Sequence, residues 1–247
     1  MATLVLLRHV QSAWNLENRF TGWWDVDLSE LGEVEARTAG GLVAEEGLSI
    51  EVAFTSVLTR AIRSADLALA AMARSWVPLY RHWRLNERHY GALTGLDKTE
   101  TRERYGDEQF HTWRRSFDVP PPPMAPDSEF DVTADPRYAT LAPGAIPATE
   151  CLADVIGRML PYWFDAIAPE LLAGRNVLVA AHGNSLRALI KHLDQISDQE
   201  ITKLEIPTGV PIVYELDKSL SPMSQRPLGN PEAIAAAAEA VRRQGQR

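Results

Sequence analysis

The chain has 247 residues, enough for one large α/β domain or two small ones, and 45% of them are hydrophobic, so a sizeable core can form. Lysine and arginine number 25 against 33 acidic residues, and the net charge of -8 excludes a global attraction to nucleic acid or an anionic membrane. No apolar run approaches the roughly 18 residues of a membrane span, and the first residues lack a basic region followed by a long apolar stretch, so no secretory leader is expected. The single cysteine, Cys151, excludes an internal disulfide, so we expect a cytoplasmic protein in which any anion site arises from local clustering of basic residues.

Short apolar runs alternate along the chain with segments of helical periodicity. The expected strands are residues 3–7, 52–55, 78–80, 177–181 and 211–216, and the expected helices are residues 29–46, 58–73, 151–172 and 185–193. This alternation predicts an α/β fold, a three-layer α/β/α sandwich with a mostly parallel central sheet. No linker divides the chain, so we expect residues 1–247 to form one domain.

Two segments depart from this alternation. Residues 117–149 are rich in proline and have little periodicity, which is typical either of a lid over a site or of a passive surface excursion. Near the end of the chain, Asn230 and Pro231 supply a helix cap and a first-turn proline for an alanine-rich helical tail, residues 230–247.

Several strand ends carry chemically useful side chains. His9 follows Arg8 at the end of the first strand, and His182 follows the strand at 177–181 in the same way. Arg60 and Glu87 follow two other predicted strands. Ligands of open α/β sheets bind outside the carboxyl ends of the strands, so these side chains share one crevice if their strands are neighbours. An imidazole beside guanidinium groups suits nucleophilic attack on a phosphate.

Each of these residues also has a structural explanation when taken alone. A histidine at a strand end is more often a hydrogen-bonded structural residue, and an arginine on a helix is most often solvated. Zinc binding by His9, His89, His182 and Glu87 is the chemical alternative. The adjacent cations Arg8 and Arg88 oppose a divalent metal, and no close HxH or HExxH spacing is present, so phosphate chemistry is favoured and no metal is expected.

Five long motifs make the chain similar to a known family. They are RHVQSAWNLENRFTGWWDVDLSELG at 8–32, TSVLTRAIR at 55–63, LNERHYGALTGLDK at 85–98, WRRSFDVPPPP at 113–123 and AAHGNSLRALIKHL at 180–193. Together they resemble the cofactor-dependent phosphoglycerate mutases of the histidine phosphatase superfamily over nearly the whole chain. The third and fourth motifs resemble the mutase branch specifically.

The resemblance implies a reaction and roles for individual residues. His9 would become a phosphohistidine, Arg8, Arg60 and His182 would hold the phosphoryl oxygens, and Glu87 would be the general acid and base. The reaction would interconvert 3-phosphoglycerate and 2-phosphoglycerate, primed by 2,3-bisphosphoglycerate, in a homodimer or homotetramer. The implied substrate-binding residues are Ser12, Asn15, Thr21, Gly22, Arg60, Glu87, Arg88, His89, Tyr90, Lys98, Arg114, Arg115, Gly183 and Asn184.

The residue after the proposed nucleophile departs from the family pattern. The family has glycine and usually glutamate where this chain has Val10 and Gln11. If a left-handed backbone is required there, valine would add strain of roughly 1–2 kcal/mol, or its methyl groups would crowd the phosphate, so Val10→Gly is expected to raise turnover. The alternatives are a broad phosphomonoesterase of the same superfamily and, because of Val10, a catalytically impaired phospho-ligand-binding protein.

Overall fold

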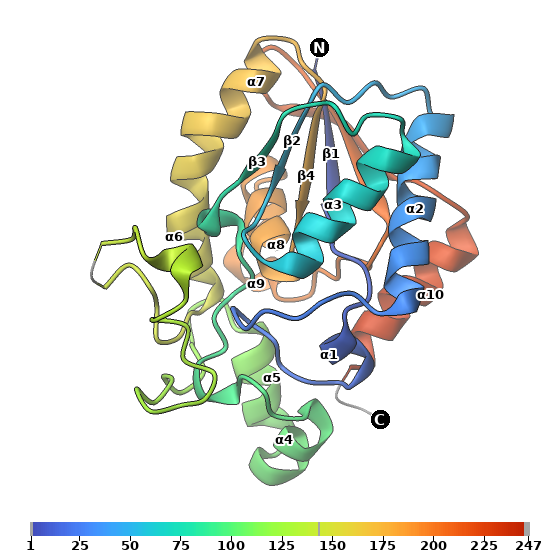
Figure 1. Cartoon of the computed structure of the whole chain (residues 1–247). Coiled ribbons are helices and arrows are strands. Elements are labelled where there is room, and N and C mark those ends of the chain that lie inside the picture. The colour runs from blue at the N-terminus through green and yellow to red at the C-terminus, as the bar shows by residue number, and fades with distance from the viewer. Residues whose placement is uncertain (1, 143, 245–247) are drawn as a thin grey trace.

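The structure, a computed structural model, describes residues 2–142 and 144–244. Within these residues the chain builds a six-stranded sheet of order β3-β2-β4-β1-β5-β6 (Figure 1). The strands are β1 (Ala2–Arg8), β2 (Val52–Thr55), β3 (Leu79–Arg81), β4 (Val177–Ala181), β5 (Pro211–Leu216) and β6 (Pro222–Pro227). The first four strands in this order run parallel, whereas β5 is antiparallel to β1 and β6 is antiparallel to β5.

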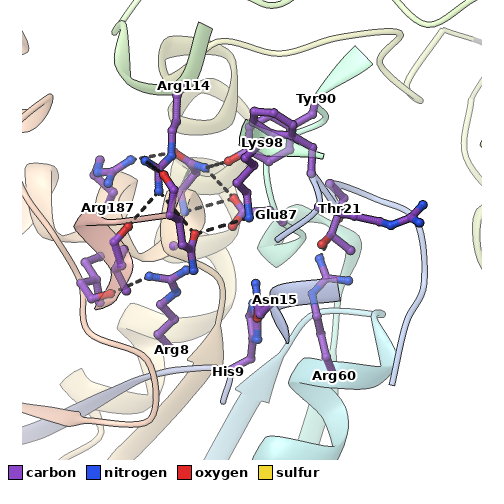
Figure 2. Close-up of a pocket in the computed structure, with 18 of the residues that line it drawn as sticks. Arg8, His9, Asn15, Thr21, Arg60, Glu87, Tyr90, Lys98, Arg114 and Arg187 are labelled. Atoms are coloured by element: carbon purple, nitrogen blue, oxygen red, sulfur yellow. Dashed lines mark hydrogen bonds between the residues drawn. The ribbon is translucent and has the colours of Figure 1, made fainter. Parts of the chain in front are cut away.

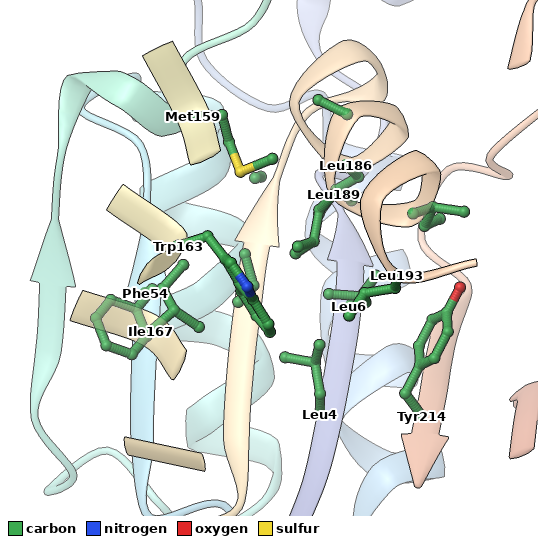
Figure 3. Close-up of a cluster of buried hydrophobic side chains, with 14 of the residues drawn as sticks. Leu4, Leu6, Phe54, Met159, Trp163, Ile167, Leu186, Leu189, Leu193 and Tyr214 are labelled. Atoms are coloured by element: carbon green, nitrogen blue, oxygen red, sulfur yellow. The ribbon is translucent and has the colours of Figure 1, made fainter. Parts of the chain in front are cut away.

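Helices cover both faces of the sheet because successive side chains of each strand point to opposite faces. Leu4 and Leu6 of β1 join a core with α6 (Leu152–Tyr162), α7 (Ala168–Leu172) and α8 (Gly183–Leu193), shown in Figure 3. Val5 and Leu7 join a second core with α2 (Glu30–Glu45) and α3 (Thr59–Ala71). The predicted fold class, a three-layer α/β/α sandwich with a mostly parallel sheet, is therefore confirmed.

A glycine lets α2 and α3 approach closely. A Cβ atom at Gly40 would lie only 2.3 Å from the backbone oxygen of Ala68, a distance that side chains do not tolerate. Because α3 carries Arg60 at its start, this close packing fixes where that arginine lies relative to the sheet.

The smaller helices gather beyond the carboxyl edge of the parallel strands. α1 (Ala13–Leu16), α4 (Lys98–Tyr105) and α5 (Asp107–Arg115) lie there, and α10 (Pro231–Arg242) brings the C-terminal region to the same side (Figure 1). The remaining short helix is α9 (Asp198–Ile201), and single 3-10 turns occur at Trp83–Leu85, Gly91–Leu93 and Pro136–Tyr138. None of the helices in the described ranges is long and apolar enough to cross a membrane.

Several elements differ from the sequence predictions. The helix expected at 151–172 is divided into α6 and α7 by a π-helical turn, Trp163–Ile167, which follows Pro161. Strand β6 and the helix pair α4 and α5 were not predicted. They lack a pattern to predict them, because α4 is polar on every side and β6 is an exposed edge strand.

The proline-rich segment at 117–149 packs against the region that follows β1 rather than extending into solvent. Tyr138 and Val132 are buried against Trp23, and the ring of Phe130 meets Trp14 edge-on. The segment therefore rests on the loop that follows the first strand.

Candidate active site

The two strand-end histidines lie side by side. β1 and β4 pair in parallel, as the shared crevice requires, and the His9 backbone N–H donates to the Ala181 oxygen at 2.8 Å. The centroids of the His9 and His182 rings are 5.0 Å apart. The expectation that these strands are neighbours is confirmed.

The His9 ring is held in its neutral form. Its Nδ1 lies 2.8 Å from the Val10 carbonyl oxygen, and because that oxygen only accepts, Nδ1 must carry the proton. Nε2 then keeps its lone pair. Burial, with the charges of Arg60 and Arg8, holds the pKa of His9 well below its usual value, so the ring is neutral at physiological pH.

Two buried arginines flank this histidine. Arg60 donates to the carbonyl oxygens of Gly22 at 2.7 Å and Trp24 at 3.1 Å. Burial lowers the pKa of Arg60 to about 10, so it stays protonated at neutral pH. Arg8 donates through Nη1 to the Ile206 oxygen, and its buried Nε has no partner among the described residues. That N–H is a free donor for an anion.

The Asn15 side chain adds a neutral donor to the pocket. Its Oδ1 accepts from the Ser12 backbone N–H at 3.2 Å and from the Ser12 hydroxyl at 3.0 Å. Because Oδ1 is occupied in this way, Nδ2 is the atom left for the pocket that Asn15 lines. Ser12 therefore acts on the pocket through Asn15.

Glu87 has two carboxylate oxygens in unlike surroundings. Oε1 accepts N–H groups from the Arg88 backbone at 2.7 Å, the Asn184 backbone at 3.1 Å and Asn184 Nδ2 at 2.8 Å. Burial acts to raise the pKa of Glu87, but these hydrogen bonds and the charges of Arg8 and Arg60 lower it below the usual value. Glu87 is therefore ionised at neutral pH, and Oε2 accepts none of these three hydrogen bonds.

A second group of cations lies across the pocket from His9 (Figure 2). Arg114 donates to the backbone oxygens of Val241 and Gln244 at the end of the C-terminal helix, at 2.9 and 2.7 Å. Arg115 pairs with Glu205. Burial, with the charges of Arg114 and Arg8, lowers the pKa of Lys98 to about 7.

The pocket thus concentrates positive charge in an acidic protein. Between the His9 group and the Lys98 group it can hold an anion with a charge at each end. Within the described residues, no group of three or more histidines, cysteines and carboxylates is placed to hold a metal ion.

Most of the predicted site residues line this pocket. Those that do are Arg8, His9, Asn15, Thr21, Gly22, Arg60, Glu87, Tyr90, Lys98, Arg114, Arg115, Gly183 and Asn184.

Four predicted residues lie behind the lining. Arg88 donates to the backbone oxygens of Trp113 and Arg114 and so holds the end of α5. His89 accepts the Gly91 N–H on its Nδ1, and its ring lies beside Trp23. Ser12 supports Asn15, as described above. The fourth, His182, contacts the Ser56 hydroxyl through Nε2 at 2.7 Å, and its buried Nδ1 has no partner among the described residues.

Sequence reasoning missed several lining residues, namely Arg19, Phe20, Arg187, Ile206, Val241 and Gln244. Arg187 carried a signal, since it stands three residues after Asn184 on a predicted helix and therefore shares its face. Ile206 and Gln244 carried none, because only the tertiary structure brings them to the strand ends.

The penalty expected at Val10 is wrong. The described non-glycine residues with positive φ are Asn18, Ala73, Gln195 and Leu220, so Val10 is not left-handed. Its side chain is fully buried with Leu28 and Ala36, and it does not line the pocket. Neither backbone strain nor crowding of a phosphate follows from this valine.

Comparison with known proteins agrees with this geometry. The family model of the histidine phosphatase superfamily, branch 1, matches residues 4–219. Proteins described as 2,3-bisphosphoglycerate-dependent phosphoglycerate mutases from Thermobifida fusca and Nitratidesulfovibrio vulgaris are 60% and 59% identical to the chain. The alignments cover 100% of both sequences in the first case, and 99% of the chain and 98% of the relative in the second.

Solved structures share the fold at lower identity. A mycobacterial glucosyl-3-phosphoglycerate phosphatase superposes with a TM-score of 0.68 at 21% identity, covering 91% of this chain and 96% of its own. A putative alpha-ribazole-5'-P phosphatase from Escherichia coli gives 0.67 at 19% identity, covering 93% and 98%.

The fold and the paired histidines define a member of the histidine phosphatase superfamily. Within that superfamily, the chain belongs to the 2,3-bisphosphoglycerate-dependent phosphoglycerate mutases, a family of isomerases.

Proposed function

We propose that the protein interconverts 3-phosphoglycerate and 2-phosphoglycerate through a phosphohistidine at His9. The observation that carries this proposal is the neutral His9 ring, whose Nε2 keeps a lone pair between two buried arginines. The full-length relatives at about 60% identity, described as mutases, support the choice of substrate. The alternative function of a broad phosphomonoesterase has no comparable support. The alternative of an impaired binding protein depended on interference by Val10, and Val10 does not line the pocket.

Bound 2,3-bisphosphoglycerate would supply the phosphoryl group that first loads His9. The residues fit a molecule with two phosphate groups and a carboxylate, because Arg8 and Arg60 lie at one end of the pocket and Lys98, Arg114 and Arg115 at the other. Tyr90, Thr21, Gly22 and the Gly183 backbone line the space between. The chemistry requires no metal.

His9 Nε2 then passes its phosphoryl group to the free hydroxyl of a monophosphoglycerate, and Glu87 Oε2 accepts the hydroxyl proton. After the bound molecule turns in the pocket, His9 takes up the other phosphoryl group, and Glu87 returns the proton to the oxygen that is released. Arg8 and Arg60 stabilise the charge that spreads over the phosphoryl oxygens during each transfer.

His182 would assist these transfers through Nδ1. A Ser56 hydroxyl that donates to Nε2 leaves the proton on Nδ1, the buried atom without a partner, and that N–H can then donate to a phosphoryl oxygen. Arg88 and His89 would support the site by holding the loop and the helix around it.

Incubation with 2,3-bisphosphoglycerate followed by intact-mass measurement tests the phosphohistidine. We expect the wild-type protein to gain one phosphoryl group and His9→Ala to gain none. An enolase-coupled assay should then show conversion of 3-phosphoglycerate. Phosphate release from many monoesters without this conversion would identify a phosphomonoesterase instead.

The organisation of the chain is part of the same proposal. We propose a single domain in which residues 117–149 act as a lid, in a cytoplasmic homodimer or homotetramer. Of the predicted tail at 230–247, Val241 and Gln244 line the pocket, and residues 245–247 lie outside the described residues. The open edge strand β3, with Tyr80 and Trp76 exposed nearby, favours self-association. Light scattering that gives the mass of a monomer at micromolar concentration would contradict the oligomer.

A further inference from the structure

A buried hydrogen-bonded relay connects an arginine outside the predicted site to Glu87. Arg187 Nη1 donates to Asn184 Oδ1 at 2.8 Å, and Asn184 Nδ2 donates to Glu87 Oε1 at 2.8 Å. All three residues are at least nine-tenths buried, and Arg187 is itself held by the Leu204 backbone oxygen, which accepts from Nε and Nη2. The arginine is therefore fixed in place before it meets the amide.

The chemistry of this relay allows only one orientation of the amide. A guanidinium can only donate and an ionised carboxylate can only accept, so Oδ1 of Asn184 must face Arg187 and Nδ2 must face Glu87. We propose that Arg187 is a positioning residue for proton transfer, because it prevents Asn184 from turning its carbonyl oxygen toward Glu87.

The consequence concerns which oxygen of Glu87 carries the proton. With three N–H groups directed at Oε1, the protonated carboxyl has no acceptor on that side, and the proton must lie on Oε2. Oε2 lies beside Gly183, since a Cβ built there would be 3.5 Å away. If the amide could turn, its oxygen would accept a hydrogen bond from a protonated Oε1, and the neutral carboxyl would be stabilised with its proton on the oxygen that does not serve the reaction.

Other charges around Glu87 would be unchanged by the loss of Arg187. Arg8 of β1, Arg60 of α3 and Lys98 of α4 face the carboxylate, and Arg8 and Arg60 supply the main charge effect on its pKa. A change in the titration of Glu87 after substitution of Arg187 would therefore report on the amide or on the lost charge of Arg187 itself, and the Asn184→Ala background described below separates the two.

The inference rests on the proposed role of Glu87 as general acid and base, and pH profiles of kcat/KM for 3-phosphoglycerate test both. In Arg187→Met, the acid limb should move to higher pH by about one unit, since the ionised form loses its enforced donor. Lys191→Met is the matched control. Lys191 also lies on α8 and holds a backbone oxygen, that of Ile196, so its loss should leave the limb in place.

Two further variants distinguish a failure of the proposed role of Glu87 from a failure of the positioning role of Arg187. Glu87→Gln should lose the activity or the acid limb, and an unaltered limb in that variant would refute the role of Glu87. In an Asn184→Ala background, Arg187→Met should move the limb no further. A limb that stays in place in Arg187→Met, or that moves equally with and without Asn184, would overturn the positioning role while leaving that of Glu87 intact.

The unaltered protein gives an independent measurement if Arg187→Met does not fold. With asparagine selectively labelled with nitrogen-15, the Asn184 side-chain amide signal should shift with the same midpoint as the acid limb. An amide signal that does not respond to pH across that midpoint would contradict the relay.

Discussion

Val10 shows how the position of one side chain changes the expected effect of a substitution. Because its methyl groups pack with Leu28 and Ala36, Val10→Gly should leave a small cavity and a more flexible backbone. We expect unfolding free energy to fall by about 1–3 kcal/mol and turnover to stay unchanged. Urea unfolding and the enolase-coupled assay measure the two effects. Faster turnover in the variant would restore the steric explanation.

Lys98 should make substrate affinity depend on pH. Its pKa of about 7 means that the charge needed by an anionic substrate is lost as the pH rises through neutrality. We expect KM for 3-phosphoglycerate to increase roughly tenfold between pH 6 and pH 9, as expected for loss of one charged hydrogen bond. Lys98→Arg stays protonated over this range and should flatten the profile. Identical profiles for the two proteins would exclude Lys98 as the cause.

The same shift has a consequence for stability. An unfolded lysine titrates near 10.5, so between pH 7 and that value the unfolded chain binds more protons than the folded one. The contribution of Lys98 to folding therefore becomes more favourable as the pH rises through this window, and below pH 7 the full penalty remains. Lys98→Met should remove this dependence from the stability of the unliganded protein.

Residues that end parallel strands were predictable, and residues that close the pocket from elsewhere were not. His9 and His182 could be placed together because β1 and β4 deliver them to one edge, a consequence of sheet geometry. Glu205 gave no such signal, because it lies in the loop before β5, which is held by contacts with Arg8, Arg115 and Arg187. The inner half of the site could thus be predicted from residue order. In the outer half the family resemblance supplied Lys98, Arg114 and Arg115, whereas Ile206 and Gln244 depended on tertiary contacts.

Among the structural elements, the loop before β5 is held by arginine side chains that line the pocket. Its backbone oxygens at Leu204 and Ile206 accept from Arg187 and Arg8, and Glu205 between them pairs with Arg115. A substrate anion that binds Arg115 must therefore compete with a carboxylate of the protein.

Glu205→Gln should weaken this competition. We expect KM for 3-phosphoglycerate to fall by roughly three- to tenfold, since a neutral amide binds a guanidinium less strongly than a carboxylate does. Glu200→Gln, on the preceding helix α9 and exposed, is the matched control. A higher KM in Glu205→Gln would mean that Glu205 orients Arg115 for substrate rather than competing with it.

Periodicity identified the elements of the core and failed at the edges of the molecule. Strands such as β4 are apolar throughout, and α3 places buried and exposed residues at helical spacing, so both were visible in the sequence. The helices α4 and α5 form part of the wall of the pocket rather than of the main core. α4 is polar, and α5 has only Phe110 and Trp113 as apolar residues, too few to mark a helix in the sequence.

At the scale of the whole molecule, the proline-rich segment at 117–149 is the proposed lid, whose role would be to keep water out of the pocket. Phe130 packs edge-on against Trp14 and Trp24, whose loop also carries Asn15 and supplies an acceptor to Arg60. If the segment is the proposed lid, these contacts would keep that loop closed while a bisphosphorylated molecule turns in the site.

Phe130→Ala should loosen this contact and admit water to the phosphoryl group on His9. We expect the ratio of 2,3-bisphosphoglycerate hydrolysis to mutase turnover to rise about tenfold, which corresponds to about 1.4 kcal/mol of lost closure. Phe164→Ala removes an exposed ring on the π-helical turn and serves as the control. Phosphate release and mutase flux measured on the same samples give the ratio. An equal ratio in all three proteins would show that the segment does not keep water from the site, whatever it contributes to stability.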